Sequence, residues 1–581
     1  MTTFVSRFGA FVLVSLLAAL PARPARACGG FFCDRPPPSG QLPIAQAGEN
    51  VLFVLDDGQV EAHIQIVYTG DAAQFSWVVP VTAAPTLDVG TDALFDRIEP
   101  PTRPSYRVQF QMDGTCQGQA QDSGGIGCGM GGSSAPGRHA VDASGSGIVT
   151  DGPTVEVVFR GNVGPYDSAV IRSDDPTALK TWLTTNGYYV SDASARIVDD
   201  YVAAHSFFVA LRLQPGKDTS AIQPIVLRLA STEGCLPLKL TAIAATPDLR
   251  INVWVLGAAR AVPLDFVEIG INDAKIDWFN SGSNYDKVLG EAANEAGGDA
   301  FAVEYSKPTA PLAQQLVPSQ SQIAQLAATT NASQYLSMLA GMGFSPTGQV
   351  LNVLRQDLPL PSDVAARGVT EAQYYATPYQ FPSSTGAPTF DAAKLTADLD
   401  AAVFMPLAKV QPLFANHKVL TRLATFISPE EMTKDPRFVT NAELPDVDPQ
   451  HLAIAHMLCG NEDYDVCHAP VRLRLESGTD VNFGVAAGAP ASCNPGVTPT
   501  YDRTTVDTLP SSDVGWMRDS VGEGHLVVDN RAAITAGLET HNASVQLSPG
   551  CGCSVSGRAR PVAATLLAVA LLIARRRRRR T

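Results

Sequence analysis

The stretch that decides the fold is Phe75-Ser76-Trp77-Val78-Val79-Pro80-Val81. Side chains alternate between the two faces of a strand, so Phe75, Trp77 and Val79 share one apolar face. Pro80 has no backbone N–H to donate to a neighbouring strand, and we expect it to end this one. The stretch therefore predicts a half-buried strand in the first part of the chain.

The segment before this strand predicts a β-hairpin. Val51–Leu55 and Val60–Tyr68 alternate apolar and polar residues and flank Asp56-Asp57-Gly58, whose composition is typical of a tight turn. His63 lies on the second strand, where a single histidine is more often a solvated or core residue than a ligand. Residues 49–112 are therefore predicted to be all-β.

A glycine-rich segment interrupts this β structure. Residues 113–152 contain 12 glycines, and we expect a long, mobile surface insertion held by a disulfide. Gly127, Gly129 and Gly132 match the spacing of a dinucleotide-binding loop. Because no predicted strand precedes them and no helix follows, we interpret the match as accidental.

Strands and helices alternate after the insertion. Asp175 is a predicted N-cap for a helix that begins at Pro176, and Asn186-Gly187 ends this helix. A second helix is predicted over Ser191–Ala204. The strands predicted in this part are Val155–Phe159, Tyr166–Ile171, Phe207–Leu213, Ile225–Leu229, Leu238–Ile243 and Ile251–Leu256.

The second half of the chain begins with helices. A helix over Asn284–Ala296 ends at Gly297-Gly298, and the pattern stays helical from Pro308 to about residue 470. The helices predicted there are Gln322–Ala328, Ala332–Ala340, Ala392–Val403 and Pro429–Thr433. Strands return at Val471–Leu475, Val481–Ala486 and His525–Val528.

The predicted architecture is α+β. It has a β-rich N-terminal domain with inserted helices, a mostly helical middle region, a small β-rich C-terminal module and a single short transmembrane tail. The predicted units are a signal peptide at 1–27, a β-rich domain at 28–305 with the insertion at 113–152, a mainly helical region at 306–470, a β-rich module at 471–548 and a tail at 549–581.

The N-terminus predicts export. Arg7 precedes an apolar run, and Ala25 and Ala27 form an A-x-A cleavage site for signal peptidase. Cys28 follows directly, so a lipoprotein is the alternative. Simple cleavage is favoured, because Ala25 occupies the position where a lipobox has an aliphatic residue and Arg26 follows it.

The C-terminal tail has three parts. Gly550, Cys551 and Cys553 precede an apolar run over residues 561–574, which an arginine block follows. As a helix this run spans about 21 Å, less than the roughly 30 Å of a bilayer core. We expect it to lie in the cytoplasmic membrane, with the block on the cytoplasmic side. The block consists of Arg575, Arg576, Arg577, Arg578, Arg579 and Arg580.

This tail resembles the myxobacterial C-terminal sorting domain, which combines a glycine-cysteine motif, a short transmembrane stretch and an arginine cluster. The resemblance implies processing near Cys551 or Cys553 by a sorting protease and delivery to the cell surface. The alternative is a stable single-pass anchor.

The ten cysteines include no C-x-x-C motif and, in an exported chain, favour disulfides over free thiols. Cys235 and Cys493 have no neighbour in sequence and could bridge distant segments. Three pairs are close in sequence, namely Cys28 with Cys33, Cys116 with Cys128, and Cys459 with Cys467.

Histidines near the last of these pairs raise the alternative of a zinc site. His451 and His456 are five residues apart, so they do not share one helical face, and no H-E-x-x-H motif occurs. A disulfide-closed loop over Asn461–Asp465 is favoured over zinc ligation by Cys459, Cys467 and His468.

Several blocks resemble an uncharacterised family of exported bacterial proteins, domain of unknown function 2330. They are Cys28-Gly29-Gly30-Phe31-Phe32-Cys33, residues 75–80, Leu94-Phe95 before Pro100-Pro101-Thr102, Leu179 to Gly187, and Cys235-Leu236-Pro237-Leu238-Lys239-Leu240. The resemblance covers about residues 28–380. The family has no assigned activity, so the resemblance implies no catalytic residue and no cofactor.

The sequence predicts a non-enzymatic role. G-x-S-x-G, S-x-x-K, Walker A and EF-hand motifs are missing, and residues 28–550 carry a net charge of −26, which disfavours nucleic acid as a partner. We therefore predict an exported, envelope-displayed protein that acts in binding or surface structure, with a ligand that the sequence does not identify. The alternative is a secreted hydrolase or metal-dependent enzyme using scattered carboxylates or Cys/His ligands.

Overall fold

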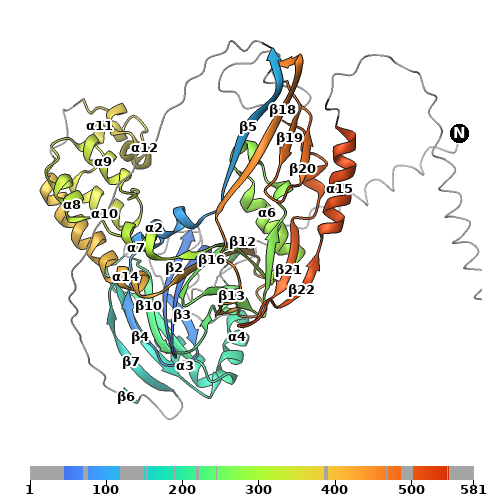
Figure 1. Cartoon of the computed structure of the whole chain (residues 1–581). Helices are drawn as coiled ribbons and strands as arrows, with labels where there is room; N and C mark the ends of the chain where they lie inside the picture. Colours follow the sequence, from blue (N-terminus) through green and yellow to red (C-terminus); the bar gives the residue numbers. More distant parts are fainter. Residues whose placement is uncertain are drawn as a thin grey trace, which may run out of the picture.

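The computed structural model describes residues 45–547, except 70–75, 118–148, 151–154, 189, 191, 218–221, 244, 385–389, 466–467, 486–500 and 546. Two β-sheets pack face to face at the centre of the molecule (Figure 1). The larger is ten-stranded, in the order β22 (His525–Asp529), β21 (Ser512–Met517), β14 (Val267–Ile271), β15 (Ala300–Pro308), β16 (Val419–Ile427), β12 (Ala245–Gly257), β1 (Ala45–Asp56), β2 (Gln59–Thr69), β10 (Ile225–Ala230) and β4 (Thr86–Val89).

The second sheet is five-stranded and lies against β1, β2 and β10. Buried apolar residues from both sheets, such as Val51 and Ile64 on one side and Val79 and Val209 on the other, form a shared core. Its strand order is β3 (Ser76–Val81), β9 (Phe207–Leu213), β8 (Tyr166–Arg172), β7 (Glu156–Val163) and β6 (Val149–Thr150).

Helices cover the outer faces of both sheets. The five-stranded sheet is covered by α3 (Pro176–Thr185) and α4 (Asp192–Ala203). The ten-stranded sheet is covered by α2 (Asp92–Thr102) and by a group of helices running from residue 310 to 416. That group comprises α7 (Ala310–Gln315), α8 (Gln320–Ala327), α9 (Ala332–Gly341), α10 (Gly348–Asp357), α11 (Ser362–Ala365), α12 (Glu371–Ala376), α13 (Ala392–Leu399) and α14 (Met405–Asn416).

A four-stranded sheet extends from the body as an arm (Figure 1). It consists of β5 (Ser105–Gln117), β18 (Gln450–Asp465), β19 (Val471–Arg474) and β20 (Asp480–Phe483). The long strands β5 and β18 run parallel, and a disulfide joins Cys116 to Cys459 across them. A three-stranded sheet of β11 (Gly234–Cys235), β17 (Arg437–Asn441) and β13 (Arg260–Leu264) completes the β structure described.

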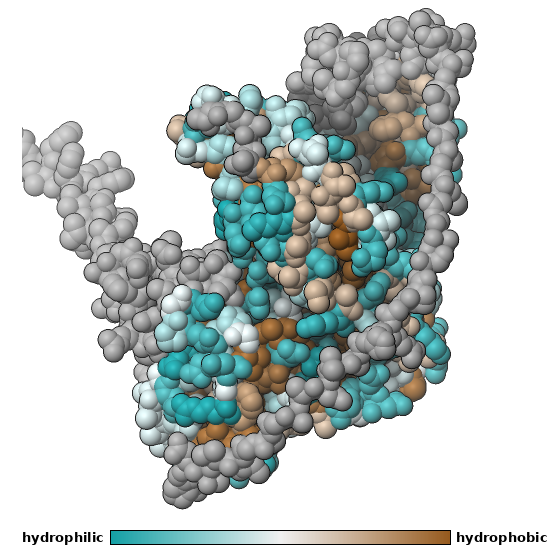
Figure 2. Space-filling model, turned by 90° about the vertical axis from the view of Figure 1, so that its left-hand side faces the viewer, coloured by the Kyte–Doolittle hydropathy of each residue, from teal (hydrophilic) through white to brown (hydrophobic). Residues whose placement is uncertain are grey.

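The remaining helices are α5 (Leu238–Thr241), α6 (Tyr285–Glu295) and α15 (Arg531–Ser544), with short 3₁₀ turns at Asp273–Lys275, Trp278–Asn280, Pro378–Gln380 and Val506–Thr508. Figure 2 shows the side of the body on which the helices from α7 to α14, the helical layer, lie. There, separate hydrophobic areas are interspersed with hydrophilic residues over the described surface. Scattered apolar residues of this kind are ordinary on a protein surface.

The strongest local predictions are confirmed. β1 and β2 form the expected hairpin, and Gly58 adopts the positive φ of +77° that its turn requires. The backbone N–H of Thr177 donates to the Asp175 carboxylate over 2.8 Å at the start of α3. β3 continues one residue beyond Pro80, which is tolerated because β3 is an edge strand.

Two predicted elements are wrong. Leu238–Ile243 does not form a strand, since Leu238–Thr241 is a short helix whose Lys239 N–H donates to the Asp435 carboxylate over 2.9 Å. Residues 429–433 form a turn rather than a helix, although the Ser428 N–H does donate to Glu431. Pro436 follows shortly and restricts the residue before it to extended conformations.

The helical region is also shorter than predicted. The helical region ends at Asn416, and residues 419–465 contain the strands β16, β17 and β18 instead of helices. β16 inserts between β12 and β15 in the central sheet. Residues 113–117 belong to strand β5 rather than to a loose insertion. The prediction that residues 49–112 are all-β is wrong, because they include helix α2. The 14-residue helix α15 was not predicted either.

The α+β class is confirmed at the level of mixed sheets and helices. Within the part of the chain that the structure describes, no helix is long and apolar enough to cross a bilayer. The predicted transmembrane run over residues 561–574 lies outside the described residues.

Candidate functional site

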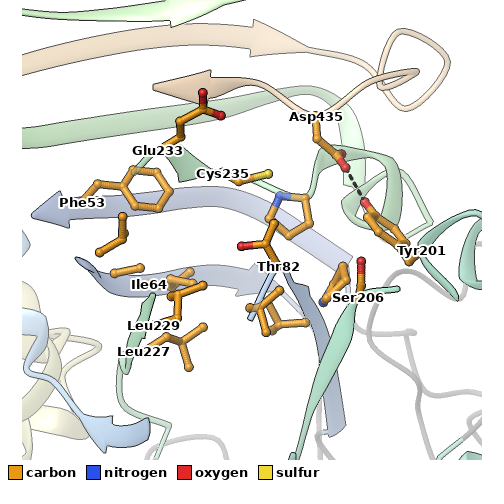
Figure 3. A pocket seen from close by; sticks show the side chains of 16 residues that line it. Phe53, Ile64, Thr82, Tyr201, Ser206, Leu227, Leu229, Glu233, Cys235 and Asp435 are labelled. Carbon is orange, nitrogen blue, oxygen red and sulfur yellow. Dashed lines mark hydrogen bonds between the residues drawn. The ribbon is translucent and has the colours of Figure 1, made fainter. Parts of the chain in front are cut away.

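A cavity that is partly open to solvent lies between the two sheets (Figure 3). Its apolar wall comes from β1, β2 and β10, where alternate residues point toward the five-stranded sheet. Val60 lies opposite Leu229 and Ala62 opposite Leu227, so each pair presents two side chains to the same space. The wall consists of Phe53, Val60, Ala62, Ile64, Leu227 and Leu229.

Strand β3 forms the opposite side of the cavity. Val79, Pro80 and Val81 of β3 line the cavity, followed by Thr82. Because β3 is the edge of its sheet, this segment can border an opening without leaving further strands unpaired. The distinctive stretch therefore helps to form the cavity as well as the core.

Polar groups gather along one border of the cavity (Figure 3). The Tyr201 hydroxyl of α4 donates to the Asp435 carboxylate over 2.8 Å, and burial raises the pKa of both groups. Glu233 lies at the same border, and the Arg437 guanidinium donates to it over 2.9 Å. Both lining carboxylates therefore already have partners within the protein.

Cys235 is a free thiol at this border. Burial raises its pKa to about 12, and the nearby Asp435 carboxylate adds to the shift. A thiol with this pKa stays protonated at neutral pH, and the protonated form is a poor nucleophile. Cys235 forms no disulfide with another described residue, and Cys493, the other cysteine predicted to bridge distant segments, lies outside the described residues.

A second, smaller cavity adjoins the first and shares Ile64, Val79 and Pro237 with it. A bulge in β1 between Gln46 and Gly48 turns Gln46 and Glu49 to the same face. The Gln46 amide donates to the Glu49 carboxylate over 2.9 Å.

Glu49 is buried, at 3% exposed, in the wall of this second cavity. Burial raises its pKa to about 7, and the hydrogen bond from Gln46 offsets only part of that effect. Glu49 is thus a carboxyl group that is buried in the wall of a cavity, and the side chain that donates to it, Gln46, is neutral.

The opposite face of the ten-stranded sheet carries a row of polar side chains, the polar row, formed by Asn50, Gln65, Asn252 and Arg422. Arg422 donates to Asn252 over 3.0 Å, Asn252 to Asn50 over 2.9 Å, and Asn50 to Gln65 over 2.8 Å. Gln65 then donates to Asp92 of α2 over 2.8 Å. The row crosses β16, β12, β1 and β2 in succession.

One end of the polar row is an ion pair with no solvent exposure. The Arg422 guanidinium lies 2.8 Å from the Glu304 carboxylate, and both side chains are 0% exposed. Glu304 sits at a register shift in β15, which turns its carboxylate toward Arg422. It also accepts from the Tyr285 hydroxyl over 2.8 Å and lies 3.6 Å from Arg250.

The predicted cysteine pairs in the middle of the chain are wrong. Cys116 and Cys459 bond to each other, so neither bonds to its close neighbour Cys128 or Cys467. The pairing follows from the parallel contact of β5 with β18, which brings together residues 343 positions apart. The sequence could have indicated this pairing only if the contact between β5 and β18 had been predicted first.

The zinc alternative loses its ligands in the same way. Cys459 is in the disulfide, the His451 ring stacks on Tyr106 with 4.7 Å between centroids, and His456 contacts Asp113 at 3.2 Å. Among the described residues, no group of three or more histidine, cysteine, aspartate or glutamate side chains is arranged to hold a metal ion. Cys467 lies outside those residues.

The other predicted cysteines and the predicted processing residues at both ends of the chain also lie outside the described residues. These are Cys28, Cys33, Cys128, Cys493, Ala25, Ala27, Gly550, Cys551, Cys553 and Arg575 to Arg580. Conversely, sequence reasoning did not find Glu49, Tyr201 or Asp435. The sequence did single out two blocks that resemble the family, residues 75–80 and 235–240. The structure shows that both blocks contribute residues to the lining of the first cavity.

Comparisons with known proteins bear on the same blocks. A family model described as an uncharacterized protein conserved in bacteria (DUF2330) matches residues 24–341. Neither the curated proteins nor the solved structures gave a match. The matched span includes every strand that lines the two cavities and exceeds half of the chain. The chain therefore belongs to this uncharacterised bacterial family, DUF2330.

Proposed function

We propose that this protein is an exported, envelope-displayed binding protein that holds a small apolar molecule in the cavity between its two sheets. The observation that carries the proposal is the composition of the cavity, with its apolar wall and few polar groups at one border. Ligand pockets usually combine such walls with a small number of polar groups that orient the ligand.

The chemistry of the border supports binding over catalysis. Cys235 keeps its proton at neutral pH, and the carboxylates of Glu233 and Asp435 are engaged by Arg437 and Tyr201. A nucleophile needs a neighbouring base or a lowered pKa, and Cys235 has a raised one. A secreted hydrolase, the alternative function, would need its reacting groups elsewhere.

Export rests on the two ends of the sequence and is supported by the disulfide. Disulfides such as Cys116–Cys459 persist mainly in oxidising compartments outside the cytoplasm. Surface delivery and processing of the tail remain part of the proposal, through the arginine block and the cysteines that precede the apolar run.

Binding is tested with a neutral, fluorescent apolar probe, Nile red, and the purified protein. Ala62→Phe places a ring in the cavity and is expected to weaken binding at least tenfold. Ala397→Phe makes the same change on the exposed face of α13 and should leave binding unchanged. Wild-type protein that does not bind the probe, or an Ala62→Phe variant that binds it equally well, contradicts the proposal.

The location and the hydrolase alternative are tested separately. Mass spectrometry of non-reduced protein from the cell surface should find the Cys116–Cys459 cross-link and no residues 575–580. Turnover of glycan or peptide libraries, or stoichiometric zinc in the purified protein, would favour the hydrolase or metal-dependent enzyme instead.

A further inference from the structure

The second cavity contains a carboxyl group whose environment is unlike that of the other two. Glu233 and Asp435, at the border of the first cavity, are engaged by Arg437 and by Tyr201. Among the described residues, Glu49 has one side-chain hydrogen bond, from the neutral amide of Gln46. It is nonetheless 3% exposed and lines the cavity.

The lining of the two cavities is acidic. It includes Glu49, Glu233 and Asp435, and it contains no lysine, arginine or histidine among the described residues. An anionic headgroup would meet like charges, neutral polar side chains and apolar surface there, but no positively charged side chain among the described residues. A cation would find a carboxylate in a place where water does not compete for it, and such ion pairs strengthen as the local dielectric falls.

We propose that Glu49 receives the protonated amine of a ligand whose apolar body extends into the first cavity. This inference rests on the proposed binding function and narrows it to one class, a primary amine on an apolar chain or ring. The ammonium donates to the Glu49 carboxylate, and Gln46 holds that carboxylate toward the cavity.

The two cavities fit the two parts of such a ligand. Ile64, Val79 and Pro237 belong to both linings, so the two cavities are neighbours, and a ligand that reaches from one to the other passes these three side chains. Burial raises the pKa of Glu49 to about 7, and Glu49 forms no ion pair with another described residue. A bound ammonium supplies the positively charged partner.

The test compares octylamine, 1-octanol and octanoate, which share an apolar chain and differ in the headgroup. At pH 8, where Glu49 is ionised, calorimetry on the purified protein should show octylamine binding at least tenfold more tightly than either of the others. Glu49→Gln keeps the size and polarity of the side chain and removes the charge. It should abolish the tenfold preference while leaving 1-octanol affinity within about twofold.

The control is Glu371→Gln, which makes the same chemical change at an exposed ion pair with Arg355 in the helical layer. It should preserve the amine preference. Equal binding of octylamine and 1-octanol by the wild type, or an amine preference that survives in Glu49→Gln, overturns this inference but leaves the proposed function standing. Failure of all three compounds and of Nile red to bind overturns both.

Discussion

The two faces of the ten-stranded sheet use the same strands in opposite ways. Val51 and Val253 point into the apolar core beside the cavities, whereas their sequence neighbours Asn50 and Asn252 belong to the polar row on the other side. Because side chains alternate along a strand, one residue separates the two environments. Apolar contacts have no fixed direction and can leave empty space, while the polar row is joined through directed bonds.

The difference suggests a division of roles. The polar row connects β16, β12, β1 and β2 to α2, so it fixes how the central strands and the helical layer meet. The apolar face holds both cavities and therefore has room for a ligand. Four changes, from the largest expected effect to the smallest, test whether the faces differ in this way.

Removing a charge from the polar face is expected to have the largest effect. Glu304→Gln leaves the guanidinium of Arg422 buried without its carboxylate partner. Breaking a buried ion pair in this way typically costs about 3–5 kcal/mol of unfolding free energy. Urea unfolding at pH 7 measures the change, and the double variant Glu304→Leu/Arg422→Met should lose less than Glu304→Gln alone. A loss below about 1 kcal/mol would show that this ion pair does not stabilise the fold.

Removing the charge of Glu49, on the cavity face, should raise the unfolding free energy instead of lowering it. Glu49 has a pKa of 4.5 when unfolded and about 7 when folded, so between these values the folded state holds a proton that the unfolded state has lost. Stability therefore falls as pH rises through this window. The total is about 3 kcal/mol at 1.36 kcal/mol per pH unit.

Glu49→Gln removes this dependence. Relative to wild type, its unfolding free energy should rise by about 3 kcal/mol between pH 4.5 and pH 8. Chemical unfolding of both proteins at four or five pH values measures the difference. A difference that stays constant with pH would mean that Glu49 titrates as an exposed carboxyl group does.

A pair of small-to-large changes compares free space on the two faces. Ala424→Leu places extra methyl groups on the packed side of β16, where overpacking costs about 1–3 kcal/mol. Ala62→Leu directs the same groups into the first cavity and should cost less than about 1 kcal/mol. Thermal unfolding of both variants checks the ranking, which equal losses would contradict.

Breaking an exposed ion pair should matter least. Arg103 donates to Asp286 over 3.1 Å, but the two side chains are 46% and 43% exposed. Solvent-exposed ion pairs contribute about 0–1 kcal/mol to the unfolding free energy. Arg103→Ala should therefore change it by no more than that. An effect as large as that of Glu304→Gln would mean that burial does not decide how much these two ion pairs stabilise the fold.

Local patterns predicted much of the fold. The hairpin of β1 and β2, the cap of α3 and the strand β3 each depend on a few neighbouring residues, which is why the sequence alone indicated them. β16 was missed because its run of apolar residues fits a helix or a buried strand equally well, and its pairing with β12 decides between them.

The candidate site was harder to predict because its parts come from distant segments. Glu49, Cys235 and Asp435 lie on three separate elements, and only the packing of the two sheets brings their cavities together. Cys235 stood out in the sequence, but its raised pKa depends on burial and on Asp435, 200 positions away. A local sequence motif does not reveal a residue that becomes a neighbour only when the chain folds.

The cross-link in the arm makes the chain a covalent ring. Because Cys116 and Cys459 close a loop over most of the body, a single protease cut anywhere between residues 117 and 458 leaves two fragments that remain attached. Such a nicked molecule keeps its intact mass on a non-reducing gel, apart from one added water, and separates only after reduction. In an environment rich in proteases, damage to a surface loop would therefore not release either half.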